Sequence, residues 1–132
     1  MATNIPKNAL VLVADGGKGL LLRNEGGGDG VLLREERRLS PKNLLDDGPS
    51  GSRPEEQTTL QTDEATFAKQ MAETLYRMLQ KGQFKALVLV ADPQTLGQLR
   101  DAMHKEVERS VVLTLDKDLT NHTIPEIARA LG

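Results

Sequence analysis

Several acidic side chains fall where a chain could assemble a phosphoryl-transfer site. Asp15 and Asp92 each end an apolar run, and Glu64 and Glu73 lie in a predicted helix between them. Carboxylates that converge from two strand ends and a helix can hold two divalent cations, which stabilise an in-line displacement at phosphorus. The alternative gives each aspartate a local role, because Asp15 precedes the glycine pair Gly16-Gly17 and Asp92 is placed as a helix cap. The local roles are favoured, and a divalent-metal-dependent nuclease is the alternative function.

A second group of polar side chains follows the last predicted strand. Asp118, Thr120, Asn121 and His122 lie close together in this segment. Because α/β sheets bind ligands in loops at the carboxyl ends of their strands, these four side chains are the candidate binding residues. The alternative is that Thr120, Asn121 or Thr123 caps the closing helix while His122 points into solvent. Capping is the favoured interpretation, since one histidine is a weak signal of a ligand site.

Residue spacing does not support a metal or nucleotide site elsewhere. His104 and Glu108 are separated by one helical turn, which is metal-ligand spacing, but no third ligand accompanies them. The glycine-rich stretches 16–19 and 26–30 lie between predicted strands, so they are interpreted as turns rather than phosphate-binding loops. The sequence therefore predicts no metal and no cofactor.

One apolar heptapeptide occurs twice and organises the predicted sheet. Residues 9–15 and 86–92 share the sequence Ala-Leu-Val-Leu-Val-Ala-Asp. A charge-free run of leucine and valine bounded by turn signals is typical of a strand buried on both faces. The two copies therefore predict neighbouring central strands of one sheet.

Hydrophobic periodicity and turn signals place the remaining elements. Further strands are predicted at about 19–24, 31–39 and 111–115, and helices at about 62–82, 93–107 and 124–131. The segment at about 40–61 is punctuated by proline and glycine and is predicted to be a flexible loop. The order β-β-β-α-β-α-β-α predicts a single α/β domain over 1–132, with a mixed five-stranded sheet flanked by helices. This order is that of ribonuclease H-like folds.

Composition excludes several functional classes. The net charge of −2 comes from interspersed charges, so no broad basic surface for nucleic acid is expected. Aromatic residues are few, which argues against a platform that stacks bases. The absence of cysteine fits a reducing compartment. Neither a membrane-spanning run nor an export signal is apparent, so we expect a cytoplasmic protein without membrane insertion.

Short motifs along most of the chain resemble those of a bacterial family described as "protein required for attachment to host cells". That family is similar in fold to the middle domain of archaeal and eukaryotic peptide-release factors. The motifs are Leu10-Val11-Leu12-Val13-Ala14-Asp15-Gly16-Gly17-Lys18, Phe67-Ala68-Lys69, Leu87-Val88-Leu89-Val90-Ala91-Asp92-Pro93, Leu96-Gly97-Gln98-Leu99-Arg100, His104-Lys105-Glu106-Val107 and Lys117-Asp118-Leu119-Thr120-Asn121-His122.

The resemblance implies an interaction protein rather than an enzyme. The family name implies a role in host attachment, and the likeness to release factors implies a partner that is the ribosome, RNA or another protein. Release factors that hydrolyse the peptidyl ester do so with a Gly-Gly-Gln tip, and these 132 residues contain no Gly-Gly-Gln. The sequence therefore predicts a non-catalytic bacterial interaction protein, and it predicts no particular oligomeric state.

Overall fold

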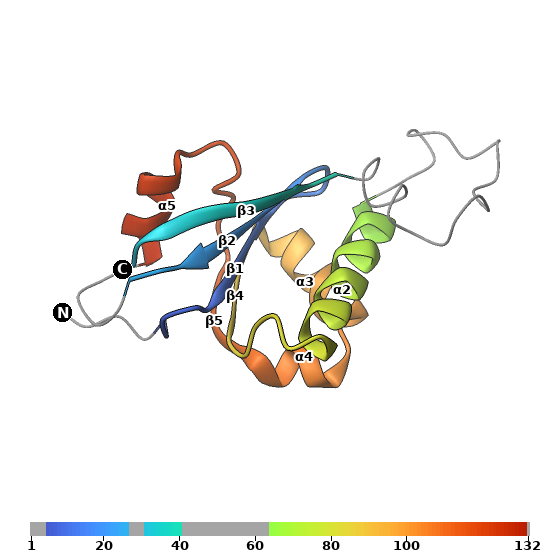
Figure 1. Cartoon of the computed structure of the whole chain (residues 1–132). Helices are drawn as coiled ribbons and strands as arrows, with labels where there is room; N and C mark the ends of the chain where they lie inside the picture. Colours follow the sequence, from blue (N-terminus) through green and yellow to red (C-terminus); the bar gives the residue numbers. More distant parts are fainter. Residues whose placement is uncertain (1–4, 27–30, 41–63, 132) are drawn as a thin grey trace.

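The computed structural model describes residues 5–26, 31–40 and 64–131, and the predicted loop at about 40–61 lies almost entirely outside these ranges. The strands are β1 (Leu10–Ala14), β2 (Gly19–Asn24), β3 (Leu33–Leu39), β4 (Leu87–Ala91) and β5 (Val111–Leu115). They form one sheet in the order β3-β2-β1-β4-β5 (Figure 1). The pairs β1–β2 and β2–β3 are antiparallel, whereas β1–β4 and β4–β5 are parallel. The predicted mixed five-stranded sheet is confirmed.

The doubled heptapeptide forms the centre of this sheet. β1 and β4 pair in parallel with Leu10 opposite Leu87 and every following residue opposite its own copy, as far as Ala14 and Ala91. All residues of both strands are buried. The leucines point to one face of the sheet and the valines to the other, because successive side chains alternate along a strand. The prediction of two central strands buried on both faces is confirmed.

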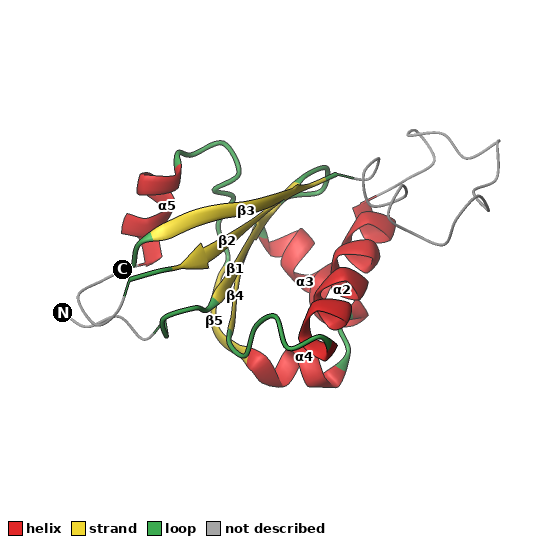
Figure 2. Cartoon of the chain, viewed as in Figure 1, coloured by secondary structure: helices red, strands yellow, loops and turns green. Residues whose placement is uncertain are grey.

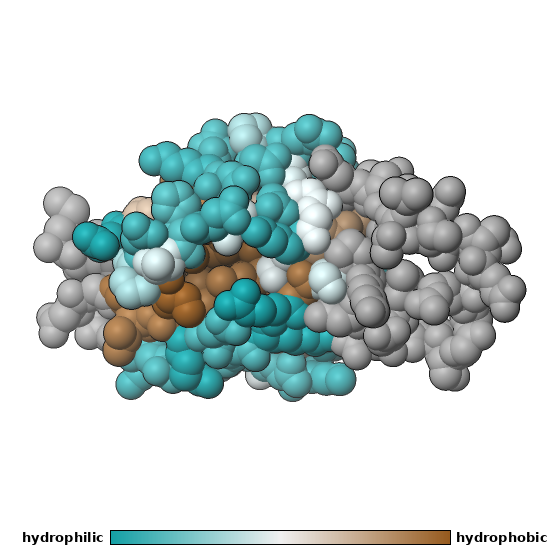
Figure 3. Space-filling view, turned by 90° about the horizontal axis from the view of Figure 1, so that it is seen from above, coloured by the Kyte–Doolittle hydropathy of each residue, from teal (hydrophilic) through white to brown (hydrophobic). Residues whose placement is uncertain are grey.

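Helices cover the two faces unequally. On the leucine face lie α2 (Glu64–Gln80), α3 (Pro93–Ala102) and α4 (Lys105–Ser110), and on the valine face lies α5 (Ile124–Leu131) (Figure 2). α2 ends at Gln80, close to the predicted end, and Gly82 just after it has a φ of 72°, the left-handed conformation that glycine adopts at low cost. A space-filling view of one side shows apolar surface as a strip between hydrophilic bands (Figure 3).

One predicted helix is wrong, because residues 93–107 form two short helices rather than one. The chain leaves helical geometry at Met103 (ψ 136°) and His104 (ψ 149°) and resumes it at Lys105. His104 is held by α2, where its Nε2 lies 2.9 Å from Glu73 Oε2 and its ring stacks on Tyr76. The apolar spacing conceals the break, because Met103 on one side of it and Val107 on the other are both buried.

The two edges of the sheet differ in charge. β3, with the sequence Leu-Arg-Glu-Glu-Arg-Arg-Leu, is rich in charge and occupies the edge next to β2. Its Glu36 forms two hydrogen bonds to Arg23 of β2, each 3.0 Å long. The opposite edge strand, β5, has the sequence Val-Val-Leu-Thr-Leu and carries no charge. Charged side chains prevent a sheet edge from pairing with other strands, so only the β3 edge has this protection.

None of the helices in the described ranges has both the length and the hydropathy needed for a membrane crossing.

Candidate functional site

Polar loops meet at the end of the sheet where β1 and β5 finish. We call this group the hairpin–loop cluster and define it by Asp15, Lys18, Asp118, Thr120 and Asn121. The first two residues belong to the turn between β1 and β2, and the other three follow β5. Thr120 and Asp15 are 105 residues apart in sequence and in direct contact through their side chains. The structure thus joins a predicted nuclease residue to three of the predicted binding residues.

Asp15 first acts on its own turn. Its Oδ1 accepts hydrogen bonds from the backbone N–H groups of Gly17 and Lys18, each 2.8 Å long. The backbone N–H of Asp15 donates in turn to the carbonyl of Lys18 at 2.9 Å. This is the hairpin role expected for an aspartate before two glycines. It leaves Oδ2 for a contact outside the turn.

Thr120 lies between two carboxylates. Its Oγ1 is 2.9 Å from Asp15 Oδ2 and 2.6 Å from Asp118 Oδ1. A hydroxyl has one proton and can fully donate to one carboxylate at a time, so Asp15 and Asp118 share this donor. The hydroxyl of Thr120, and then its backbone N–H, hold the pKa of Asp118 below the usual value, with smaller contributions from the charges of Lys18 and His122.

Lys18 connects the hairpin to the other end of the loop. Its Nζ donates a hydrogen bond of 2.7 Å to Asn121 Oδ1. Lys18 and Asn121 are both exposed, so the ammonium is open to solvent, and its charge contributes to the lowered pKa of Asp118. The sequence drew attention to this lysine only as part of a glycine-rich turn. A cation at the tip of a hairpin that follows a central strand is the signal that could have identified it.

His122, the fourth predicted binding residue, belongs to the start of α5 instead. Thr123 and Glu126 form a reciprocal capping box, in which Thr123 N donates to Glu126 Oε1 at 2.8 Å and Glu126 N donates to Thr123 Oγ1 at 3.3 Å. The backbone and hydroxyl of Thr123 lower the pKa of Glu126. His122 is exposed, and its Nδ1 lies 3.5 Å from Glu126 Oε1.

The acidic residues of the alternative nuclease site make separate hydrogen bonds and do not converge on one site in the described part of the chain. Asp92 Oδ2 accepts a hydrogen bond of 3.1 Å from Thr95 N and so caps α3, as predicted. Asp15 binds its own hairpin and Thr120, and Glu73 binds His104, while the side chain of Glu64 lies outside what the structure describes. In the described part of the chain, no group of three or more histidine, aspartate or glutamate residues could hold a metal ion.

His104 and Glu108, which have metal-ligand spacing in the sequence, make separate contacts in the structure. His104 pairs with Glu73 of α2, and its ring lies 3.7 Å from the ring of Tyr76 at an angle of 8°. Glu108 instead lines a groove beside β5. The contacts of His104 join α2 to the junction of α3 and α4, which is a structural role.

The hairpin–loop cluster offers groups that could bind a ligand. Both oxygens of Asp15 and Oδ1 of Asp118 accept hydrogen bonds that hold the loop in place. Lys18 uses one of its three N–H donors on Asn121, so two remain for an acceptor outside the chain. A fixed polar loop with an available cation suits a phosphate or a carboxylate as its partner.

Comparisons with known proteins show which family and which solved structure this chain is similar to. The sequence model of bacterial archaeo-eukaryotic release factor family 12 matches residues 8–131. A solved structure described as "Archaeal protein" superposes with a TM-score of 0.51 at 11% identity, over 83% of this chain and 30% of that one. This likeness shows the fold alone, and the chain spans less than a third of the archaeal chain. No curated protein matches. Host attachment and the ribonuclease H-like assignment stay predictions, because the matched family is named for release factors.

Proposed function

This chain belongs to bacterial archaeo-eukaryotic release factor family 12, and from that membership we propose that it is a non-catalytic binding protein of the translation machinery. The proposed partner is the ribosome, contacted through its RNA. The observation that carries the proposal is the extent of the family match, which includes every strand of the sheet and every described helix.

The lack of a hydrolytic tip supports binding over peptide release. A release factor positions a water molecule with Gly-Gly-Gln, and that tripeptide does not occur in these 132 residues. The carboxylates of Asp15 and Asp92 are engaged in a turn and a helix cap. We therefore assign the chain recognition without ester hydrolysis.

The hairpin–loop cluster is the proposed contact surface. Lys18 is exposed and is aligned by its hydrogen bond to Asn121. Lys117, which precedes Asp118 in the sequence, is exposed as well. Lysine binds a phosphate as a point charge, and each phosphate neutralised adds to the salt dependence of binding. Because the chain as a whole has a net charge of −2, the phosphate contacts must come from local lysines such as these, and we expect binding to weaken as salt rises.

Sedimentation tests the proposal. A tagged chain, expressed in a bacterium that carries this gene, is centrifuged through sucrose gradients at low and at high salt. We expect it to migrate with ribosomes or a ribosomal subunit at low salt and to be released at high salt. A chain that stays at the top of the gradient at low salt contradicts the proposal.

A charge reversal localises the contact. Lys18→Glu removes the proposed phosphate contact, while Lys105→Glu makes the same charge change on α4 at another exposed position. We expect only Lys18→Glu to leave the ribosomal fractions. Equal behaviour of the two variants excludes the hairpin–loop cluster as the contact surface.

A further inference from the structure

The open edge of β5 lacks the protection that β3 has. Within the described residues β5 pairs only with β4, so its other side offers unpaired backbone groups. All five of its residues are uncharged, and Val112 is 45% exposed. An uncharged, apolar edge strand is a template for a further strand.

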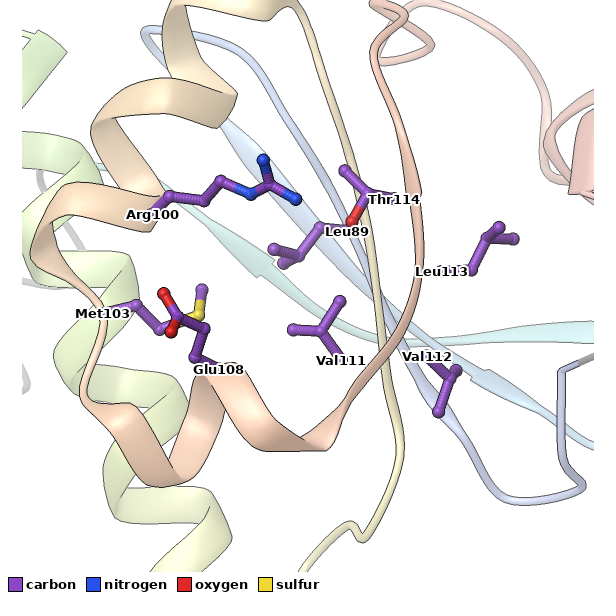
Figure 4. A pocket seen from close by; sticks show the side chains of 8 residues that line it. All are labelled: Leu89, Arg100, Met103, Glu108, Val111, Val112, Leu113 and Thr114. Atoms are coloured by element: carbon purple, nitrogen blue, oxygen red, sulfur yellow. The ribbon is translucent and has the colours of Figure 1, made fainter.

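A groove runs beside this edge and carries opposite charges at its two ends. It has a volume of about 380 Å³ and an apolar floor of Leu89, Met103 and Val111. Arg100 extends across the groove toward Thr114, near the end of β5, whereas Glu108 lies near Val111, where the strand begins (Figure 4). The charge along the groove therefore changes from negative to positive in the direction of the strand.

The two charged side chains of the groove have no partner within the described residues. The side chains of Arg100 and Glu108 form no ion pair or hydrogen bond with any residue in the described ranges. This contrasts with β3, where Arg34 and Glu36 belong to a connected set of ion pairs. Two charges without a partner beside an unpaired strand indicate an external strand with complementary charges.

We propose that β5 pairs antiparallel with β5 of a second copy of this chain, which makes one continuous sheet across a two-fold axis. Antiparallel pairing reverses the direction of the second strand, so Glu108 of the second copy comes beside Arg100 of the first. The two-fold axis repeats this contact with the roles exchanged. A parallel arrangement of the same two edges would turn one sheet over and place the two grooves on opposite faces, where Arg100 and Glu108 of different copies could not pair. The complementary charges of the groove therefore favour the antiparallel arrangement of two copies.

Analytical ultracentrifugation of the full chain tests the pairing. At roughly 100 μM we expect a dimer that dissociates on dilution, because a short strand with two flanking charge pairs buries less than a standard interface. Val112→Lys places a charge on the edge at an exposed position and weakens the dimer by at least about tenfold. Leu32→Lys is the matched control, because Leu32 is 62% exposed and lies outside β5, and it leaves the dimer unchanged.

Charge reversal tests the direction of pairing. Arg100→Glu turns both attractions into repulsions, so we expect about tenfold weaker association. The double variant Arg100→Glu with Glu108→Arg restores the attraction and the dimer, and circular dichroism checks that each variant is folded. A monomer at the highest concentration, a dimer that Val112→Lys leaves intact, or a double variant without rescue overturns the proposal.

Discussion

Replacing Thr120 by valine tests whether the hairpin–loop cluster is held by its shared hydroxyl. The change removes the hydroxyl that contacts both Asp15 and Asp118, at 2.9 and 2.6 Å, with little change of shape. A hydrogen bond to a charged group contributes about 1.5–3 kcal/mol, and the single proton counts once. Because Asp118 is exposed, water replaces part of that interaction, so we expect a loss of about 1 kcal/mol.

Urea and thermal denaturation measure this loss, with Thr120→Ser as the control that keeps the hydroxyl. A loss of about 1 kcal/mol corresponds to a fall in Tm of about 4 °C for a chain of this size. The pKa of Asp118 is lowered in the folded state from an ordinary value of 3.8, so its contribution is present above that value and is lost as pH falls through the folded pKa. The stability difference between the valine and serine variants therefore narrows below about pH 4. Equal stability of the two variants at pH 7 would refute the reasoning.

Three further predictions concern the scaffold. Asn24→Ala should reduce the free energy of unfolding by about 3 kcal/mol in urea denaturation, since this fully buried amide makes four hydrogen bonds to backbone groups; stability within 1 kcal/mol of wild type would contradict this. Gly19→Ala should cost about 1 kcal/mol in the same assay, because the added Cβ would lie 3.0 Å from Met71 Sδ; an unchanged midpoint would show that the methionine moves aside freely. In carboxyl NMR titrations, Glu126 should titrate below its ordinary pKa of 4.5, and Thr123→Ala should return it toward that value; no change would remove the capping box as the cause.

The arrangement of the sheet could be predicted because one pattern was strong and repeated. The identical copies at 9–15 and 86–92 carry the alternation of a strand with two buried faces, and the structure pairs them residue by residue. The break after Ala102 could not be predicted in the same way. It depends on the contacts of His104 with Glu73 and Tyr76 from another helix, which local spacing does not encode.

The candidate site was predictable only in its local parts. The sequence indicated a turn for Asp15 and a cap for Asp92, because each depends on the residues that follow directly. The contact between Asp15 and Thr120 depends on how two distant loops meet, and no spacing signals it. Asn24 shows the same limit, since it looks like the polar end of a strand but is fully buried, bound to Ile5 and to the turn that follows it.

A photocrosslink from the hairpin tip tests the central claim most directly. Gly17 is exposed, and a Cβ there would meet only Asp15 Oδ1, at 3.9 Å, so a photoreactive residue fits without disturbing the turn. A second photoreactive residue, at Lys105 on α4, is the control. After irradiation of living cells, binding to the translation machinery predicts ribosomal RNA or a ribosomal protein joined to position 17 and not to position 105. Crosslinks at position 17 to partners outside the ribosome alone, or none above the control, would contradict the account.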